Sequence, residues 1–160
     1  MNGKNLGHSL QEHQQQAWKF VALSESQARG RTFSADYILI SIQDPNEPPV
    51  ALPEPPHCRG ILRMQFDDIT ARQGSLTLFS REQTSAILDF VEEHKREAAL
   101  IACHCKMGMC RSPAVLAALA EVMGGDDAFL RDRRGRPKYR PNRYVYDLLV
   151  SEGRRHPLGR

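Results

Sequence analysis

The sequence lacks the features of a membrane-spanning chain and those of a disulfide-rich secreted one. No apolar run approaches the roughly 18 residues of a transmembrane helix. The first 16 residues are polar and rich in Gln and His, without the apolar core of a secretory signal. Three of the four cysteines fall within eight residues, which does not suit a disulfide framework: Cys58, Cys103, Cys105 and Cys110. We therefore expect no membrane span and a reducing, cytoplasmic environment.

No internal repeat is visible either, and the composition is that of an ordinary soluble protein. With 160 residues, of which 41% are hydrophobic and 26% charged, the chain is large enough for one domain with its own core. We expect a flexible arm over residues 1–17, a single domain over residues 18–153 and a tail over residues 154–160. We also expect a monomer.

Apolar patterns predict alternating strands and helices. Four short apolar or β-branched runs predict strands at residues 18–23, 37–42, 61–66 and 100–104. Helical spacing predicts a helix that begins at Ser80, further helices at 112–123 and 142–150, and short helical segments within 24–31 and 126–131. This alternation indicates an α/β fold with a central, mostly parallel sheet flanked by helices.

Two segments have unusual compositions. Residues 44–57 hold six of the ten prolines, which excludes a helix, so this stretch is a stiff crossover between strands or a flap that faces the substrate. Residues 128–143 carry seven basic side chains against Asp132 alone. They form either a patch for an anionic partner, nucleic acid included, or a solvated loop.

Residues 98–123 carry the chemistry. An apolar strand leads into a polar turn from His104 to Ser112, and an Ala/Leu-rich helix follows. A strand that enters a tight loop and then a helix exposes unpaired N–H groups, which bind anions. The turn contains a candidate nucleophile, Cys105, and a guanidinium, Arg111, with Gly108 between them.

These residue types suit the transfer of a phosphoryl group to sulfur. A helix N-terminus and a nearby cation both favour a thiolate at Cys105. Gly108 lets the backbone adopt positive φ, and Arg111 offers two parallel donors to phosphate oxygens. Ser112 can hydrogen-bond the sulfur. The backbone N–H groups that are expected to converge on the phosphate belong to Lys106, Met107, Gly108, Met109 and Cys110.

The segment His104–Ser112 resembles the His-Cys-x5-Arg-Ser/Thr loop of protein tyrosine and dual-specificity phosphatases. The resemblance implies a phosphatase-like fold with the phosphate-binding loop between a strand and a helix, and a phosphocysteine intermediate on Cys105. It also implies that Arg111 binds the phosphoryl group, that His104 is buried and tunes the loop, and that no metal or cofactor is needed. Phe-Asp-Asp-Ile, Ile-Ser-Ile-Gln-Asp-Pro and Arg-Pro-Asn are similar to segments of small phosphatase-like proteins of bacteria and phages.

A carboxylate that protonates the leaving oxygen is expected upstream of the nucleophile. Asp67 and Asp68 follow a predicted strand, so they should reach the same sheet edge as Cys105. In phosphatases with this Phe-Asp-Asp sequence the second acid acts, which implies Asp68 as general acid and Asp67 as the reserve.

Other interpretations stay open. Cys105-x4-Cys110 is similar to low-molecular-weight tyrosine phosphatases, where the second cysteine traps the oxidised first one, so Cys110 is a redox candidate. A zinc site is not expected, because no Cys-x2-Cys pair or fourth ligand is evident. The expected substrate is a phosphorylated protein or peptide, above all one with phosphotyrosine. Phosphoinositides, RNA 5′-phosphates, a non-catalytic phospho-binding module and a sulfur-transfer protein are the alternatives.

Overall fold

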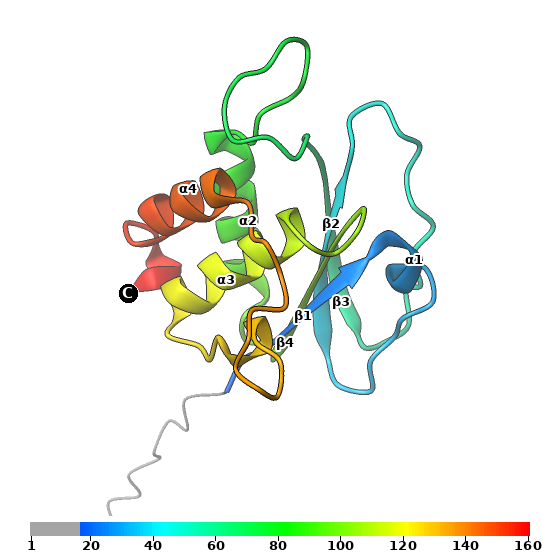
Figure 1. Ribbon diagram of the computed structural model, residues 1–160. Helices are drawn as coiled ribbons and strands as arrows, with labels where there is room; N and C mark the ends of the chain where they lie inside the picture. The colour runs from blue at the N-terminus through cyan, green and yellow to red at the C-terminus, as the bar shows by residue number, and fades with distance from the viewer. Residues whose placement is uncertain (1–16) are drawn as a thin grey trace, which may run out of the picture.

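The computed structural model describes residues 17–160 and is built on one sheet whose strands are all parallel (Figure 1). The strands are β1 (Lys19–Ser24), β2 (Tyr37–Gln43), β3 (Cys58–Gln65) and β4 (Leu100–Cys105). Their order is β1-β4-β2-β3, which leaves β1 and β3 at the edges. The predicted α/β fold with a central parallel sheet is confirmed.

The central strands are the most apolar ones because helices or loops cover both of their faces. Every residue of β2 and of β4 is buried. The edge strand β3 begins three residues before its apolar run, because Cys58 pairs with Tyr37 across an irregularity in the register. Residues 44–57 connect β2 to β3 without a helix, as their prolines predict.

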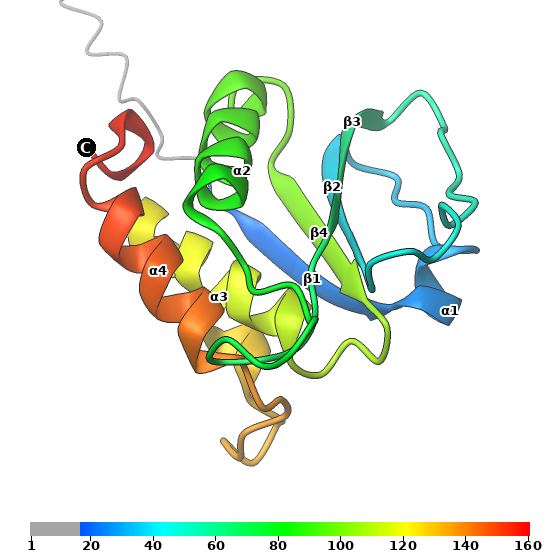
Figure 2. The ribbon, with the colours of Figure 1, turned by 90° about the horizontal axis from the view of Figure 1, so that it is seen from above.

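Three longer helices lie on one side of the sheet (Figure 2). They are α2 (Arg81–His94), α3 (Arg111–Met123) and α4 (Arg143–Gly153). Of these, α2 and α3 contact the strands, and α4 packs against α3 and α2. The predicted capping box of α2 is present, with Ser80 accepting from the Gln83 N–H and the Gln83 side chain accepting from the Ser80 N–H. Gly124 ends α3 in a left-handed conformation.

Three short helices complete the chain: α1 (Glu25–Ala28), η1 (Ala128–Leu130) and η2 (Pro157–Gly159). The main core lies between the sheet and the three longer helices, and a smaller cluster around Tyr37 and Leu39 lies on the opposite face. Residues 154–160, expected as a tail, include η2, whose Leu158 is buried against the main core. Residues 1–16 of the expected arm lie outside the described residues.

No helix among residues 17–160 is long and apolar enough to cross a membrane. The carboxyl ends of β1, β2 and β4 meet at one edge of the sheet, where α3 begins. In open parallel sheets this edge is the usual place for ligands.

Candidate active site

Cys105 is the last residue of β4, and the loop that follows it turns back into α3. The side chain is 2% exposed, and its Sγ lies 3.3 Å from the Ser112 Oγ. Gly108 in the loop has φ +69°, and a Cβ there would lie 2.7 Å from the backbone N of Ser24. The end of β1 therefore supports the loop so closely that only glycine fits.

The surroundings of Cys105 stabilise a thiolate. Burial by itself raises the pKa of the thiol, but several groups outweigh it and bring the pKa below the ordinary value. These groups are the Ser112 hydroxyl, the backbone N–H groups of Ser112 and Gly108, and the positive charge of Arg111. The sulfur thus has the low-pKa character of a nucleophile.

Arg111 is the first residue of α3, and its guanidinium is held from one side. Its Nη1 donates to the Asp44 Oδ1 and to the Phe66 carbonyl, both at 2.7 Å. No other described residue accepts a hydrogen bond from this guanidinium. The guanidinium is thus held through one nitrogen and retains further N–H groups that can donate to an anion.

The two adjacent aspartates have different surroundings. The Asp67 Oδ2 accepts from the Thr77 N–H at 2.7 Å, and this bond closes the loop that follows β3. Asp68 is exposed, and its Oδ1 accepts from the Asn142 Nδ2 at 2.8 Å. Asp67 therefore has a structural partner, whereas Asp68 is held near the nucleophile loop.

Asn142 connects three elements of the site. Its Nδ2 also donates to the Ile69 carbonyl, and its Oδ1 accepts from the Val145 N–H as the N-cap of α4. Its backbone N–H donates to the Cys110 carbonyl at 2.9 Å. One buried amide thus fixes the acid-bearing loop, the nucleophile loop and the start of α4 relative to one another.

A hollow of about 460 Å³ lies between the acid-bearing loop, the end of the nucleophile loop and the start of α4. Asp68, Cys110 and Asn142 line it together with Arg140 and Arg143. Burial and the negative charge of Asp68 raise the pKa of the Cys110 thiol, in contrast to that of Cys105. Cys110 is therefore mainly a neutral thiol beside the candidate acid.

His104 is fully buried behind the nucleophile. Its Nε2 lies 2.6 Å from the Ser41 Oγ of β2, and its Nδ1 lies 3.5 Å from the Cys105 carbonyl. Burial lowers the pKa of the imidazole, with smaller opposing effects from the backbone and Glu25. The ring is therefore neutral near pH 7 and connects β2 to the strand that carries Cys105.

The remaining predicted loop residues differ in exposure. The Lys106 Nζ lies 3.2 Å from the Glu47 Oε1 and 3.8 Å from the Glu25 Oε2, so its side chain is paired with carboxylates. Met107 and Met109 are exposed, with 73% of Met107 accessible. These methionines form the outer rim of the loop.

Comparison with solved structures identifies proteins that share this fold. No family model and no curated protein matches the chain. Solved structures do match: the human tyrosine phosphatase-like serine/threonine/tyrosine-interacting protein is 17% identical, with a TM-score of 0.56 over 83% of this chain and 89% of that one. Tk-PTP in its active form is 24% identical, with a TM-score of 0.50 over 85% and 90% of the two chains. The chain has the fold of the tyrosine and dual-specificity phosphatases.

A third match of this phosphatase fold is PTPMT1 in complex with PI(5)P, which is 15% identical with a TM-score of 0.50. It covers 86% of this chain and 91% of that one. The match therefore extends over most of this chain. These identities establish the fold, and the chemistry has to be argued from the side chains.

The sequence analysis assigned no role to three site residues, Asp44, Asn142 and Ser41, although all three lie in segments that it found similar to phosphatase-like proteins. From local structure, Asp44-Pro45 predicts the end of a strand and Asn142 the start of a helix, and neither prediction gives a contact with the site. The partners of Asp44 and Asn142 lie 67 and 74 positions away in the sequence, so no local pattern indicates the contacts. Within residues 17–160, no group of three or more His, Cys, Asp or Glu side chains is arranged to hold a metal ion.

Proposed function

We propose that this protein is a cysteine-dependent phosphatase that hydrolyses phosphomonoesters, with phosphotyrosine in proteins or peptides as its main substrate. The observation that carries the proposal is the buried Cys105, whose thiol pKa is lowered at the base of a loop that also presents Arg111. A thiolate beside a guanidinium and a helix N-terminus is suited to attack on a phosphate ester.

The reaction has two steps. The Cys105 thiolate attacks phosphorus, the P–O bond to the leaving group breaks, and Asp68 gives its proton to the departing oxygen. The loop amides and the free N–H groups of Arg111 hold the other phosphate oxygens. In the second step the Asp68 carboxylate takes a proton from water, and the water oxygen bonds to phosphorus as the S–P bond breaks. Inorganic phosphate leaves, and the Cys105 thiolate and the protonated Asp68 are restored.

The choice of Asp68 rests on its surroundings. Asp67 already accepts a hydrogen bond from the Thr77 N–H, whereas Asp68 is exposed beside the loop and oriented by Asn142. A general acid needs access to the substrate and a fixed orientation, and Asp68 combines both. The position of Ser112 supports a further role in the second step, because its hydroxyl stabilises the leaving thiolate.

Hydrolysis of p-nitrophenyl phosphate tests the proposal. The wild-type chain is measured against pH, with and without EDTA, beside Cys105→Ser, Asp68→Asn and Asp67→Asn. We expect EDTA-insensitive activity that Cys105→Ser abolishes and Asp68→Asn lowers about 100-fold, the usual contribution of a general acid. If Asp67→Asn is the more damaging change, the acid assignment is wrong. A wild-type chain that binds phosphotyrosine peptide but hydrolyses nothing under reductant is a phosphate-binding module instead.

A further inference from the structure

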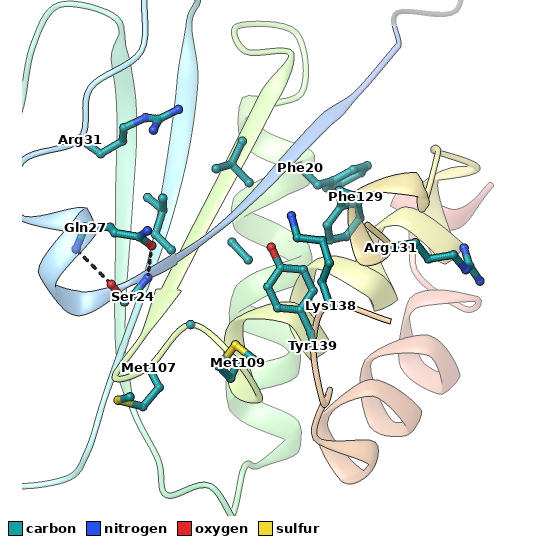
Figure 3. Close-up of a pocket in the computed structure, with 14 residues that line it drawn as sticks. Phe20, Ser24, Gln27, Arg31, Met107, Met109, Phe129, Arg131, Lys138 and Tyr139 are labelled. Atoms are coloured by element: carbon teal, nitrogen blue, oxygen red, sulfur yellow. Dashed lines mark hydrogen bonds between the residues drawn. The ribbon is translucent and has the colours of Figure 1, made fainter. Parts of the chain in front are cut away.

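A second hollow lies beside the nucleophile loop, and Asp68 does not line it. It has a volume of about 580 Å³ and follows the outer edge of β1 from Phe20 to Ser24. Met107, Gly108 and Met109 line part of it, so the hollow borders the loop that follows Cys105. Figure 3 shows Arg31 and Lys138 on opposite sides of the β1 ribbon, with the two methionines at the loop end.

The edge of β1 that faces this hollow has no partner strand among the described residues. The Lys19 N–H donates to the Ala99 carbonyl and the Glu25 N–H to the Lys106 carbonyl, so odd-numbered residues direct their amides toward β4. Because strand residues alternate, the N–H and C=O groups of Phe20 and Ala22 are directed outward. Within residues 17–160 no hydrogen bond to another side chain or loop satisfies them.

The charges that line the hollow have one sign. Arg31, Arg131 and Lys138 contribute cations, and the lining contains no carboxylate. Arg131 pairs with Asp127, whereas Arg31 lies over the Phe33 ring and Lys138 over the Tyr139 ring, at 5.1 and 5.3 Å. Neither Arg31 nor Lys138 forms an ion pair with a described residue, so both are available to an anionic ligand.

We propose that this hollow is the docking groove for an extended, acidic segment of a phosphopeptide substrate. The segment pairs as a strand with the edge of β1 that is unpaired among residues 17–160, while its phosphate enters the Cys105 loop. The proposal rests on the proposed phosphatase function and names the substrate class of the same site. Arg31 and Lys138 bind acidic side chains that flank the phosphorylated residue. Met107 and Met109 contact the residues next to the phosphate.

The backbone edge favours a peptide over a nucleic acid. A strand edge alternates donors and acceptors, and a peptide satisfies both kinds of group. A phosphodiester chain presents mainly acceptors, so it would leave the outward carbonyls of Phe20 and Ala22 without partners. Charge alone does not distinguish the two polyanions, but the backbone pattern does.

The experiment compares kcat/KM for a phosphotyrosine peptide with Glu-rich flanks and for the same peptide N-methylated at one flanking position at a time. We expect N-methylation to lower kcat/KM at every second position on one side, because only alternate N–H groups face β1. Arg31→Glu and Lys138→Glu should each lower kcat/KM for this peptide by about fivefold, the scale of an exposed ion pair replaced by repulsion. Both should leave p-nitrophenyl phosphate unaffected.

Arg96→Glu is the matched control, since Arg96 is exposed at the opposite end of β4 and should leave both substrates unchanged. Equal losses on p-nitrophenyl phosphate and peptide would overturn the groove, because the variants would then disturb the loop itself. Two results together would overturn the proposal and show a general polyanion groove. In the first, Arg31→Glu and Lys138→Glu lower kcat/KM for a 5′-phosphorylated oligonucleotide as much as for the peptide. In the second, N-methylation of the peptide has no effect that alternates with position.

The two proposals fail in different ways. If the wild type hydrolyses p-nitrophenyl phosphate, but its kcat/KM for peptides depends neither on the flanking residues nor on N-methylation, only the proposal of the groove is wrong. If the wild type hydrolyses nothing, the phosphatase is wrong, and binding of the same peptides to the Cys105→Ser chain then decides on the groove. If N-methylation at alternate positions still weakens binding of the peptide to the Cys105→Ser chain, the groove is supported. If N-methylation has no such alternating effect, the groove is overturned.

Discussion

Single side chains set the protonation of the proposed nucleophile, and Ser112 is the one whose contribution can be isolated. Its hydroxyl lies 3.3 Å from the Cys105 sulfur and lowers the pKa of the thiol. Ser112→Ala should therefore raise this pKa, because the thiolate loses one hydrogen bond. The measurement is the rate of alkylation of the Cys105 peptide by iodoacetamide against pH, resolved by mass spectrometry. Ser112→Thr, which keeps a hydroxyl, should stay close to the wild type, and an unshifted profile in Ser112→Ala would contradict the assignment.

Asp44 determines how Arg111 is presented to a phosphate. Because the Asp44 Oδ1 holds one guanidinium nitrogen at 2.7 Å, Asp44→Ala should lower kcat by about tenfold through loss of orientation. Steady-state kinetics with p-nitrophenyl phosphate and inhibition by inorganic phosphate measure the effect. Glu47→Gln is the control, since Glu47 pairs with Lys106 rather than Arg111. Tighter inhibition by phosphate in Asp44→Ala, with kcat unchanged, would show that Asp44 competes with the substrate instead.

At the scale of the elements, the approach of the nucleophile loop to β1 depends on Gly108. Gly108→Ala combines a positive φ with a Cβ 2.7 Å from backbone, so we expect a loss of about 2–4 kcal/mol in the free energy of unfolding and loss of activity. Gly74 also has positive φ, but a Cβ at that position would meet no other atom within 4 Å. Urea titration of Gly74→Ala should show only the conformational cost of about 1 kcal/mol. Equal losses in the two variants would mean that the contact with β1 is unimportant.

Asn142 joins the acid-bearing loop to α4, and its two roles can be separated. Asn142→Ser keeps an N-cap acceptor, so the free energy of unfolding should fall less than in Asn142→Ala, which should lose about 1 kcal/mol. Asn142→Ser removes the amide donor to Asp68, so the candidate acid is no longer held beside the nucleophile loop. The value of kcat for p-nitrophenyl phosphate should therefore fall about tenfold through loss of orientation. An unchanged kcat would leave Asn142 with the structural role alone.

The same elements show what local sequence predicts and what it does not. The strands, the capping box of α2 and the glycine stop of α3 follow from periodicity and composition, and their structure agrees. Cys105, Gly108 and Arg111 are close in sequence, so one strand–loop–helix unit is sufficient to bring them together. Asp44 and Asn142 reach the loop from the ends of other elements, and those contacts depend on strand order and on the docking of α4. Local patterns carry no information of that kind.

For the whole molecule, the buried His104 makes stability depend on pH. Its folded-state pKa is lowered from the ordinary 6.5, mainly by burial, so the unfolded chain binds a proton at a pH where the folded chain does not. The resulting stability is fully present above pH 6.5 and is lost as the pH falls through the folded-state pKa, at up to about 1.4 kcal/mol per pH unit.

Urea unfolding of the wild type and of His104→Gln between pH 8 and pH 4 measures this effect. The free energy of unfolding of the wild type should fall more steeply than that of His104→Gln below pH 6.5. The two slopes should be parallel above pH 6.5, because the imidazole is then unprotonated in both the folded and the unfolded chain. Ser41→Ala is the second variant, since it removes the hydroxyl partner of the ring but keeps the titrating group. It should keep the steep slope. If the slopes for wild type and His104→Gln are parallel at every pH, the folded protein binds a proton at His104 as readily as the unfolded chain does, and burial does not lower the pKa.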